Sequence, residues 1–267
     1  MLARAFLRRW RPMVREAYHV LYRRLLPIHW WLVNRFSQHA TPPGMSLPPA
    51  KLRFRVAEST SASLFFRVGE RASKDIEDVL AEAGYAVNNF TNILDFGCGC
   101  GRTLTWLLAR FPAVNWHGTD VDAEAIEWCR RNIPNASFRV NAPLPPLAYP
   151  DATFDLVYTV SVFTHLSEEY QHAWIPEFRR VLRPSGLLLL TFHSEHVWKA
   201  LDDALDIERC GLVFRSSTKL KGILPEWYQT TLQTADHILN ALSRHFTVIR
   251  HSSRGLGDQD VVIARRD

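Results

Sequence analysis

The sequence has few cysteines and no long apolar segment, and these two absences narrow the class of protein. Its 267 residues include four cysteines, too few for a disulfide framework in a chain of this length. No cysteines and histidines combine in the spacing of a zinc site, so we predict no metal and a reducing, cytoplasmic compartment. No run approaches the roughly 20 apolar residues of a transmembrane helix. Four arginines interrupt any apolar centre of a secretory signal, namely Arg8, Arg9, Arg11 and Arg15.

Acidic residues are scarce in the first fifty positions, and the positive charge is concentrated there. The chain has a formal net charge of +5 and is 47% hydrophobic, a composition that excludes a disordered or collagen-like chain. Residues 1–50 hold eight arginines and only Glu16 as an acid, whereas the rest of the chain is slightly acidic. A basic segment attached to a slightly acidic body gives no reason to expect nucleic acid as a partner.

Residues 2–26 are predicted to form a basic amphipathic helix. At about 100° per residue, most arginines fall on one face and the apolar side chains on the other, where they are Phe6, Trp10, Met13, Val14, Ala17, Val20 and Leu21. We expect Pro27 to end or kink this helix, and the Pro- and Gly-rich stretch near 40–50 to be a linker. The sequence thus divides into a helical arm over 1–45 and a main domain over 46–267.

Three accounts of this arm remain open. The first is a helix docked on the main domain, whose charged face stays in water. The second is peripheral contact with an anionic membrane through residues 2–26. The third is a targeting segment that is cleaved, since an Arg-rich and acid-poor N-terminus is typical of transit peptides.

Beyond the linker, short apolar strands alternate with amphipathic helices. A first helix is expected over 73–84, with Ser73 as its N-cap. Strands are then expected at 92–96, 116–119, 137–140, 154–160, 186–192, 246–250 and 260–265, and helices at 102–110, 123–131, 167–182, 195–208 and 230–243. Repeated β-α units predict a doubly wound α/β fold, which binds ligands at the carboxyl ends of its strands.

Residues 209–229 interrupt this alternation, and we predict that they form a lid or an acceptor-binding insertion. Lys219 and Lys221 lie in this segment. They are either solvated loop residues or contacts for an anionic acceptor.

The most informative motif is a Gly-x-Gly-x-Gly turn over residues 97–101, which joins a predicted strand to a helix. Glycines let the backbone approach a ligand closely, and the spacing differs from the Gly-x-Gly-x-x-Gly of dinucleotide sites. Asp95 precedes the turn and suits a cationic group. Asp120 ends the next strand and suits two ribose hydroxyls. Together these residues favour a nucleoside that carries a positive charge and no phosphate.

At these residues the chain resembles the class I S-adenosylmethionine-dependent methyltransferases, over about residues 70–267. Residues 154–166 are similar to the family's fourth strand and following loop, 178–190 to its helix and fifth strand, and 259–265 to its last strand. The resemblance implies an α/β fold with a doubly wound, seven-stranded and mostly parallel sheet whose last strand is antiparallel, here with an added N-terminal helical arm. It also implies S-adenosyl-L-methionine as the cofactor.

The resemblance implies which residues hold that cofactor. Asp95 and the glycine turn would face its methionine end, Asp120 its ribose, and Val121 and Asn141 its adenine. Many relatives have aspartate where Asn141 stands, but an amide oxygen can also accept a hydrogen bond from the adenine amino group. The full implied set is Asp95, Gly97, Cys98, Gly99, Gly101, Arg102, Asp120, Val121, Asn141, Ala142 and Ser161.

The implied reaction is methyl transfer to an oxygen or nitrogen of a small-molecule acceptor, such as a metabolite, a saccharide or a lipid-like compound. Such a transfer depends on alignment and on exclusion of water. For a hydroxyl acceptor, His165 and His193 are the candidate general bases, because imidazole titrates near neutrality. Two alternatives remain open: a catalytically silent protein of this fold that acts through its basic arm, and a nicotinamide-dependent oxidoreductase.

Overall fold

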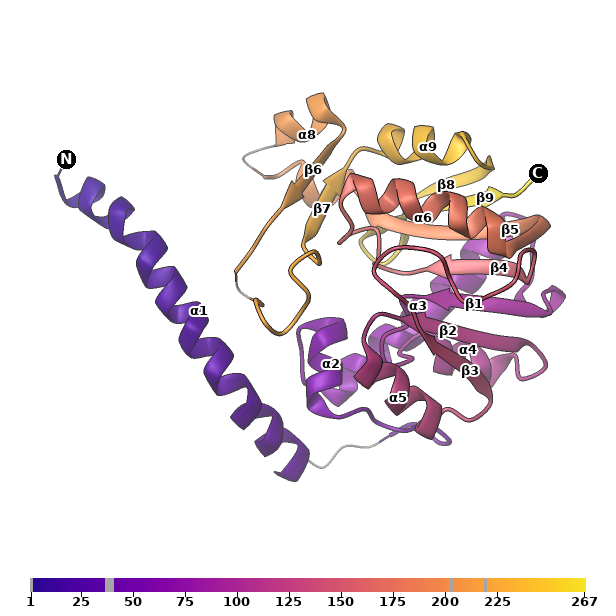
Figure 1. Cartoon of the computed structure of the whole chain (residues 1–267), viewed down its shortest axis with the longest axis horizontal. Helices are drawn as coiled ribbons and strands as arrows, with labels where there is room; N and C mark the ends of the chain where they lie inside the picture. The colour runs from indigo at the N-terminus through magenta and orange to yellow at the C-terminus, as the bar shows by residue number, and fades with distance from the viewer. Residues whose placement is uncertain (1, 37–40, 202–203, 219) are drawn as a thin grey trace.

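The computed structural model contains one seven-stranded sheet, with the strand order β3-β2-β1-β4-β5-β9-β8 (Figure 1). The structure describes residues 2–36, 41–201, 204–218 and 220–267, with side chains from residue 16 onward. Five strands run parallel to one another: β1 (Asn92–Phe96), β2 (Asn115–Asp120), β3 (Ala136–Val140), β4 (Phe154–Thr159) and β5 (Leu182–His193). The last strand, β9 (Gln259–Arg265), runs antiparallel to both β5 and β8 (Thr247–Leu256). The predicted fold is confirmed.

Helices cover both faces of this sheet, which explains why its central strands are almost entirely apolar. On one face lie α3 (Ala62–Glu82), α4 (Leu104–Arg110) and α5 (Ala123–Asn132). On the other face lie α6 (Glu168–Val181) and α9 (Ala235–Ser243). The chain turns to opposite faces after β1 and after β4, so the carboxyl ends of these two neighbouring strands leave a crevice between them.

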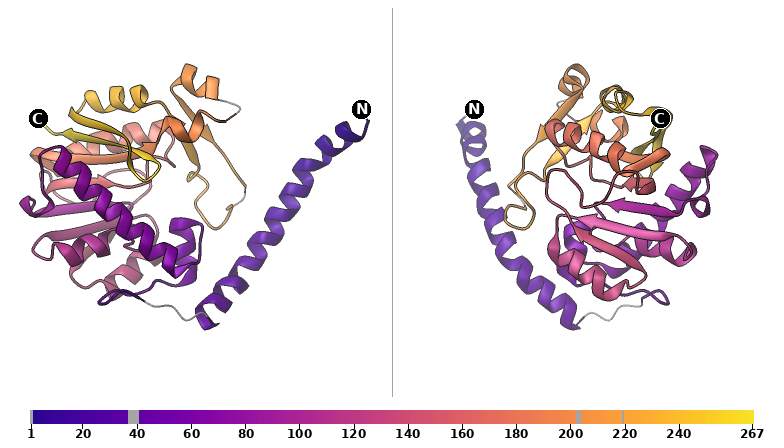
Figure 2. Two further views of the ribbon diagram at one scale, coloured as in Figure 1. Left: turned by 180° about the vertical axis from the view of Figure 1, so that it is seen from behind. Right: turned by 45° about the vertical axis from the view of Figure 1, so that its right-hand side comes forward.

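The basic arm is a single long helix, α1 (Leu2–Phe36), which runs along the outside of the domain (Figures 1 and 2). The predicted break at Pro27 is wrong. A proline inside a helix removes one backbone hydrogen bond, but Leu26 and Trp30 on either side of it are buried against Phe54 of a short helix, α2 (Ala50–Ala57). This packing holds the helix together through the proline.

The face of α1 that docks differs from the apolar face expected from the sequence. The docked side chains are Leu26 and Trp30, with Tyr22 and Val33 beside them. Of the expected apolar face, Ala17, Val20 and Leu21 are exposed. The side chains of Phe6, Trp10, Met13 and Val14, and of the arginines before residue 16, lie outside the described residues.

The helix expected over 73–84 begins earlier than the sequence suggests. α3 starts at Ala62, and its N-cap is Ser61, whose side chain accepts a hydrogen bond from the Leu64 amide at 3.2 Å. Ser73 lies inside the helix, where its hydroxyl donates to the Glu70 carbonyl at 2.7 Å. Ser73 is therefore not a cap, because its backbone continues a helix already capped twelve residues upstream.

The segment between β5 and β8 also departs from the prediction. The helix expected over 195–208 is two helices, α7 (Glu195–Trp198) and α8 (Ala204–Cys210). The helix expected over 230–243 begins as a strand, β7 (Thr230–Gln233), which pairs with β6 (Leu212–Arg215). The long loop between these strands reaches towards α1 and α2 (Figures 1 and 2). None of the helices described is both long and apolar enough to cross a membrane.

Candidate functional site

A cavity of about 600 Å³ lies at the carboxyl ends of β1, β2 and β4, a size typical of small-molecule sites. Ten of the residues predicted from the sequence line it: Asp95, Gly97, Cys98, Gly99, Arg102, Asp120, Val121, Asn141, Ser161 and His165. The described lining residues do not include Gly101, Ala142 or His193. A side chain on Gly101 would meet Ile133 and Thr105. The absence of a side chain at this position therefore allows close packing behind the turn.

The glycine turn is held tightly between its neighbours. Gly97 and Gly99 adopt φ values of +77° and +54°, which side chains rarely allow. A Cβ on Gly97 would lie 2.3 Å from Val162, and one on Gly99 would lie 2.5 Å from Val56. The amide of Gly97 donates to the Thr119 carbonyl at 2.8 Å. The backbone of the turn can therefore form part of the cavity wall itself.

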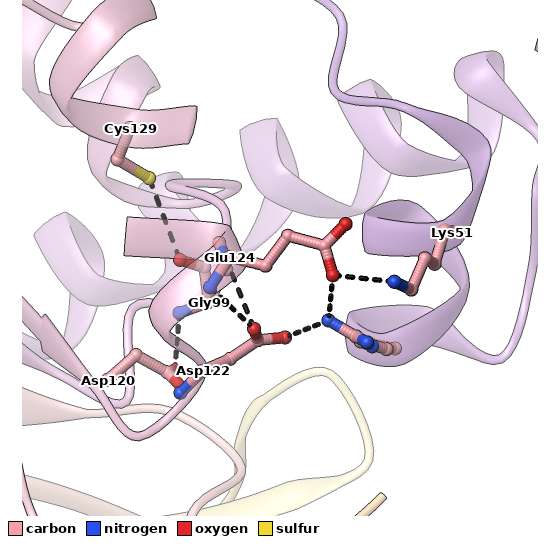
Figure 3. Close-up of polar contacts among 8 residues, drawn as sticks. Lys51, Gly99, Asp120, Asp122, Glu124 and Cys129 are labelled. Atoms are coloured by element: carbon pink, nitrogen blue, oxygen red, sulfur yellow. Dashed lines mark hydrogen bonds and ion pairs between the residues drawn. The ribbon is translucent and has the colours of Figure 1, made fainter. Parts of the chain in front are cut away.

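Asp120 joins the end of β2 to this turn. One carboxylate oxygen accepts from the Gly99 amide at 2.7 Å, and the other accepts from the Asp122 amide at 2.8 Å (Figure 3). Burial raises the pKa of Asp120, and these backbone donors oppose the increase. Each oxygen keeps further acceptor capacity, so the carboxylate can still bind two hydroxyl groups of a ligand.

Asp95 is a second buried carboxyl in the same wall. Burial raises its pKa to about 7, and Asp120 adds to the increase, whereas the Tyr158 hydroxyl and Arg102 oppose it. A carboxyl at this pKa gains a proton easily near neutral pH and loses it when a cation approaches. Asp95 is therefore suited to a cationic group of a ligand.

The side-chain oxygen of Asn141 is a hydrogen-bond acceptor without a donor among the described residues. The amide nitrogen of this side chain donates to the Ala142 carbonyl at 2.8 Å. Its oxygen, Oδ1, is buried and has no hydrogen-bond partner among the described residues. Buried polar atoms are normally satisfied, so this oxygen fits the amino group of a bound ligand, as the adenine of the implied cofactor would provide.

His165 lies in the loop that follows β4, with a defined protonation state. Its Nδ1 is 2.7 Å from the Gln229 carbonyl, which can only accept, so Nδ1 carries the proton and Nε2 is left as an acceptor. Burial lowers the pKa of His165 to about 4, against the opposing effect of the Gln229 carbonyl. The ring is therefore neutral at neutral pH. His193 binds the Thr231 carbonyl through Nδ1 at 2.9 Å, and burial lowers its pKa as well.

Helix α2 contributes residues that were not predicted, because no element was expected between the linker near 40–50 and the helix expected over 73–84. Arg55 contacts Asp122 at 2.7 Å and Glu124 at 3.0 Å, and Lys51 contacts Glu124 at 2.7 Å (Figure 3). Asp122 also caps α5, accepting from the Glu124 and Ala125 amides, as a residue of this type before a helix would be expected to do. These ion pairs fix α2 over the end of β2.

The loop between β6 and β7 forms an apolar roof, which we define as residues 222–228. Within it, Trp227 stacks on Tyr170 at 5.7 Å, and Tyr228 stacks on His165 at 4.0 Å between ring centroids. Ile223, Leu224 and Pro225 line the same cavity. The sequence marked this segment as an insertion but gave no signal for these particular side chains.

Comparison with known proteins shows similarity to methyltransferases. Residues 93–186 match the family model described as a methyltransferase domain. A fatty-acid O-methyltransferase of Mycolicibacterium smegmatis is 26% identical over 175 residues, which cover 65% of this chain and 54% of that protein. A malonyl-[acyl-carrier protein] O-methyltransferase of Hahella chejuensis is 31% identical over 126 residues, which cover 44% of each chain. The chain thus spans about half the length of the curated relatives it matches.

Solved structures share the fold at lower sequence identity. The PH0226 protein from Pyrococcus horikoshii OT3 has a TM-score of 0.55 and 18% identity, covering 73% of this chain and 89% of that one. An S-adenosylmethionine-dependent methyltransferase from Mesorhizobium loti has a TM-score of 0.53 and 18% identity, covering 71% of this chain and 96% of that one. These similarities establish the fold.

Proposed function

Because the chain contains a class I S-adenosylmethionine-dependent methyltransferase domain, we propose that it transfers a methyl group to an oxygen atom of a small-molecule acceptor with an apolar body. One observation carries the proposal: a single cavity joins the glycine turn and Asp120 to His165 and to the apolar roof. Cofactor-binding groups and an acceptor-binding surface therefore face the same space.

The family implies S-adenosyl-L-methionine, which supplies a methyl group on a positively charged sulfur when it is bound. In our proposal Asp120 accepts from the ribose hydroxyls, and Asn141 Oδ1 accepts from the adenine amino group. Asp95 and the turn from Gly97 to Gly99 bind the methionine end, with Cys98 and Arg102 in the adjoining wall. Val121, Ala142 and Ser161 complete the predicted set, with Gly101 behind the turn.

The chain's own contribution to the reaction is to exclude water and to place the acceptor oxygen. The roof covers the cavity with aromatic and aliphatic side chains, which suit an apolar acceptor body. When the acceptor is a hydroxyl, its proton passes to His165 Nε2 as the oxygen attacks. A carboxylate acceptor has no proton to lose and no hydrogen to donate to Nε2, so His165 then takes no part in proton transfer. His193, which lies behind His165, remains the second candidate base.

The relatives support an oxygen acceptor with an acidic or apolar character. Two of them are named as O-methyltransferases, one for a fatty acid and one for malonyl-[acyl-carrier protein]. The acceptor of this chain is proposed only at the level of its chemical class, since these proteins share less than a third of their residues with it in the matched regions.

We also propose a cytoplasmic location with peripheral membrane contact through α1. The described cysteines are all free, and Cys98, Cys100 and Cys129 are buried thiols, which fits a reducing compartment. Large apolar side chains form an exposed stripe along α1 at helical spacing, namely Tyr18, Leu21, Leu25, Ile28 and Leu32. An apolar stripe on an arginine-rich helix is typical of helices that lie on anionic lipid.

The first test is binding of S-adenosylhomocysteine, the demethylated product, followed by a screen of acceptors with a labelled methyl donor. We expect micromolar binding by calorimetry, and a loss of 10-fold or more in Asp120→Ala because two hydroxyl partners are lost. Asp258→Ala, in an exposed turn, is the matched control and should bind normally.

The alternatives give different results in the same experiment. Binding of the product without transfer to any hydroxyl or carboxylate acceptor would favour a catalytically silent protein of this fold. Binding of a nicotinamide dinucleotide in place of the product would favour an oxidoreductase and overturn the proposal.

A further inference from the structure

A second cavity, of about 420 Å³, lies between α1, α2 and the loop that carries the roof. Five cationic side chains line it: Arg23, Arg24, Lys51, Arg55 and Lys221. No acidic side chain is among the described residues of its lining. Figure 2 shows how α1 and the loop, far apart in the sequence, approach each other at this place.

Four of these five cations make ion pairs, each with an acid that does not line the second cavity. Arg23 pairs with Glu16 at 3.2 Å, and Arg55 pairs with Asp122 at 2.7 Å. Lys51 and Arg55 share Glu124, which lines the first cavity and not the second. Lys221 lies 3.6 Å from Glu226, and Arg24 makes no ion pair within the described part of the chain. The second cavity therefore has unbalanced positive charge on its wall, which an anion would stabilise.

Two buried nitrogen donors in the same wall also lack acceptors. Trp30, only 8% exposed, has an indole N–H without a hydrogen-bond partner among the described residues, and the same is true of Arg55 Nε. Both groups can only donate. Donors that are buried without an acceptor are uncommon in native proteins, so the wall is complementary to a ligand that only accepts, as a phosphate or carboxylate does.

The two cavities share a wall. Arg55, Gly222 and Ile223 line both of them, so the two cavities are adjacent at the edge of the roof. We propose that the second cavity binds an anionic group, a phosphate or a carboxylate, of the methyl acceptor. The inference rests on the proposed function and extends it: the acceptor has an oxygen nucleophile, an apolar body and, at a distance, an oxyanion.

The test uses the full chain and measures binding of n-octyl phosphate, with n-octanol as the neutral counterpart. Arg24→Gln combined with Lys221→Gln removes two charges from the cavity wall, and Trp30→Phe removes one donor while keeping an aromatic ring. Arg209→Gln, on the exposed surface of α8, is the matched control. Binding of S-adenosylhomocysteine is measured for each variant, because it reports on the first cavity alone.

We expect n-octyl phosphate to bind more tightly than n-octanol and to bind less tightly as salt increases. The double variant should lose at least 10-fold in affinity, Trp30→Phe about 3-fold, and Arg209→Gln nothing, with product binding unchanged in all of them. Equal affinity for n-octyl phosphate and n-octanol, or equal affinity in the native chain and the double variant, would overturn the inference. If the native chain does not bind S-adenosylhomocysteine, the proposed function is overturned instead.

Two further probes identify the source of the oxyanion. Competition by inorganic phosphate would assign the cavity to the anionic group of a free, soluble acceptor. Competition with n-octyl phosphate by a soluble short-chain phosphatidylglycerol would assign it to a lipid headgroup. Either result supports the inference, and the absence of both, together with no binding of n-octyl phosphate, contradicts it.

Discussion

Asp95 shows how one residue can make the stability of the site depend on pH. Its pKa in the folded chain is about 7 because it is buried, against 3.8 for an ordinary aspartate. Between these values the folded chain holds a proton that the unfolded chain has released. As pH rises through this window, the free energy of unfolding of the chain without cofactor therefore decreases, because the stabilisation from protonated Asp95 is lost.

Asp95→Asn removes this dependence, since asparagine does not titrate. We expect the stability of the variant relative to the native chain to increase by about 2–3 kcal/mol between pH 5 and pH 8. Denaturant unfolding of both chains at a series of pH values measures the difference. Asp258→Asn should show no such trend, and a constant difference for Asp95→Asn would mean that Asp95 is already ionised at pH 5.

His165 makes a prediction that depends on the acceptor. His165→Gln replaces a neutral acceptor by a weakly basic amide, so kcat with a hydroxyl acceptor should fall about 100-fold. With a carboxylate acceptor it should change little. Since the pKa of His165 is about 4, titration of this ring should give no inflection in the rate between pH 6 and pH 8.

Rates with matched hydroxyl and carboxylate acceptors test this directly, and product binding checks that the site is intact. His172→Gln, on the exposed face of α6, is the control. An unchanged kcat with the hydroxyl acceptor would remove His165 from the reaction.

Among the elements, α3 packs against Arg102, the residue that follows the glycine turn. A Cβ on Gly69 of α3 would lie 2.2 Å from the backbone carbonyl oxygen of Arg102. Alanine normally stabilises a helix interior relative to glycine by about 0.5–1 kcal/mol. Here the contact is with backbone, which cannot move aside without shifting the turn.

Gly69→Ala should therefore destabilise the chain by about 1–3 kcal/mol, the usual cost of overpacking. It should also weaken binding of S-adenosylhomocysteine, because Arg102 adjoins the turn. Thermal unfolding and calorimetry measure the two effects. Lys74→Ala, at an exposed position of the same helix, should not lose stability, and a stabilised Gly69→Ala chain would show that α3 can move without cost.

The elements also show what the sequence could predict. The strands from β1 to β4 were located to within one residue at each end, because turn residues flank each of them. β5 begins four residues before its predicted start, at Leu182. The glycine turn, Asp95 and Asp120 followed from the local pattern, whereas Val121, Asn141 and Ser161 were implied by the family resemblance. In contrast, Thr230–Gln233 is flanked by helix-compatible residues, and only its pairing with β6 makes it a strand.

Tertiary packing explains the remaining differences. Pro27 is a strong local signal for a helix end, yet burial of Leu26 and Trp30 overrides it. Arg55 and Tyr228 reach the cavity from segments that have no motif of their own. A single sequence contains no local signal for such long-range contacts, which is why the cavity-lining residues at the ends of the strands could be named from the sequence and those of α2 and the roof could not.

At the scale of the whole molecule, charge and apolar surface are concentrated on one outer helix. We expect the full chain to float with vesicles that contain phosphatidylglycerol and not with phosphatidylcholine vesicles. Leu21→Glu combined with Ile28→Glu places acids in the exposed stripe and should abolish flotation while product binding is retained. The Arg209→Gln chain serves as the control. Equal flotation of the double variant and the native chain would exclude the stripe as the membrane-binding surface.

The contacts of α1 also have a consequence for the order of assembly on the ribosome. Thr218 hydrogen-bonds to Glu16 and is close to His19, at sequence separations of 202 and 199 residues. At about 5–20 residues per second, roughly 10–40 s of translation separate these partners. During that interval α2 can already cover Leu26 and Trp30, but the wall between the two cavities cannot form. The nascent chain therefore presents its basic helix to lipid or chaperones well before it can enclose a substrate.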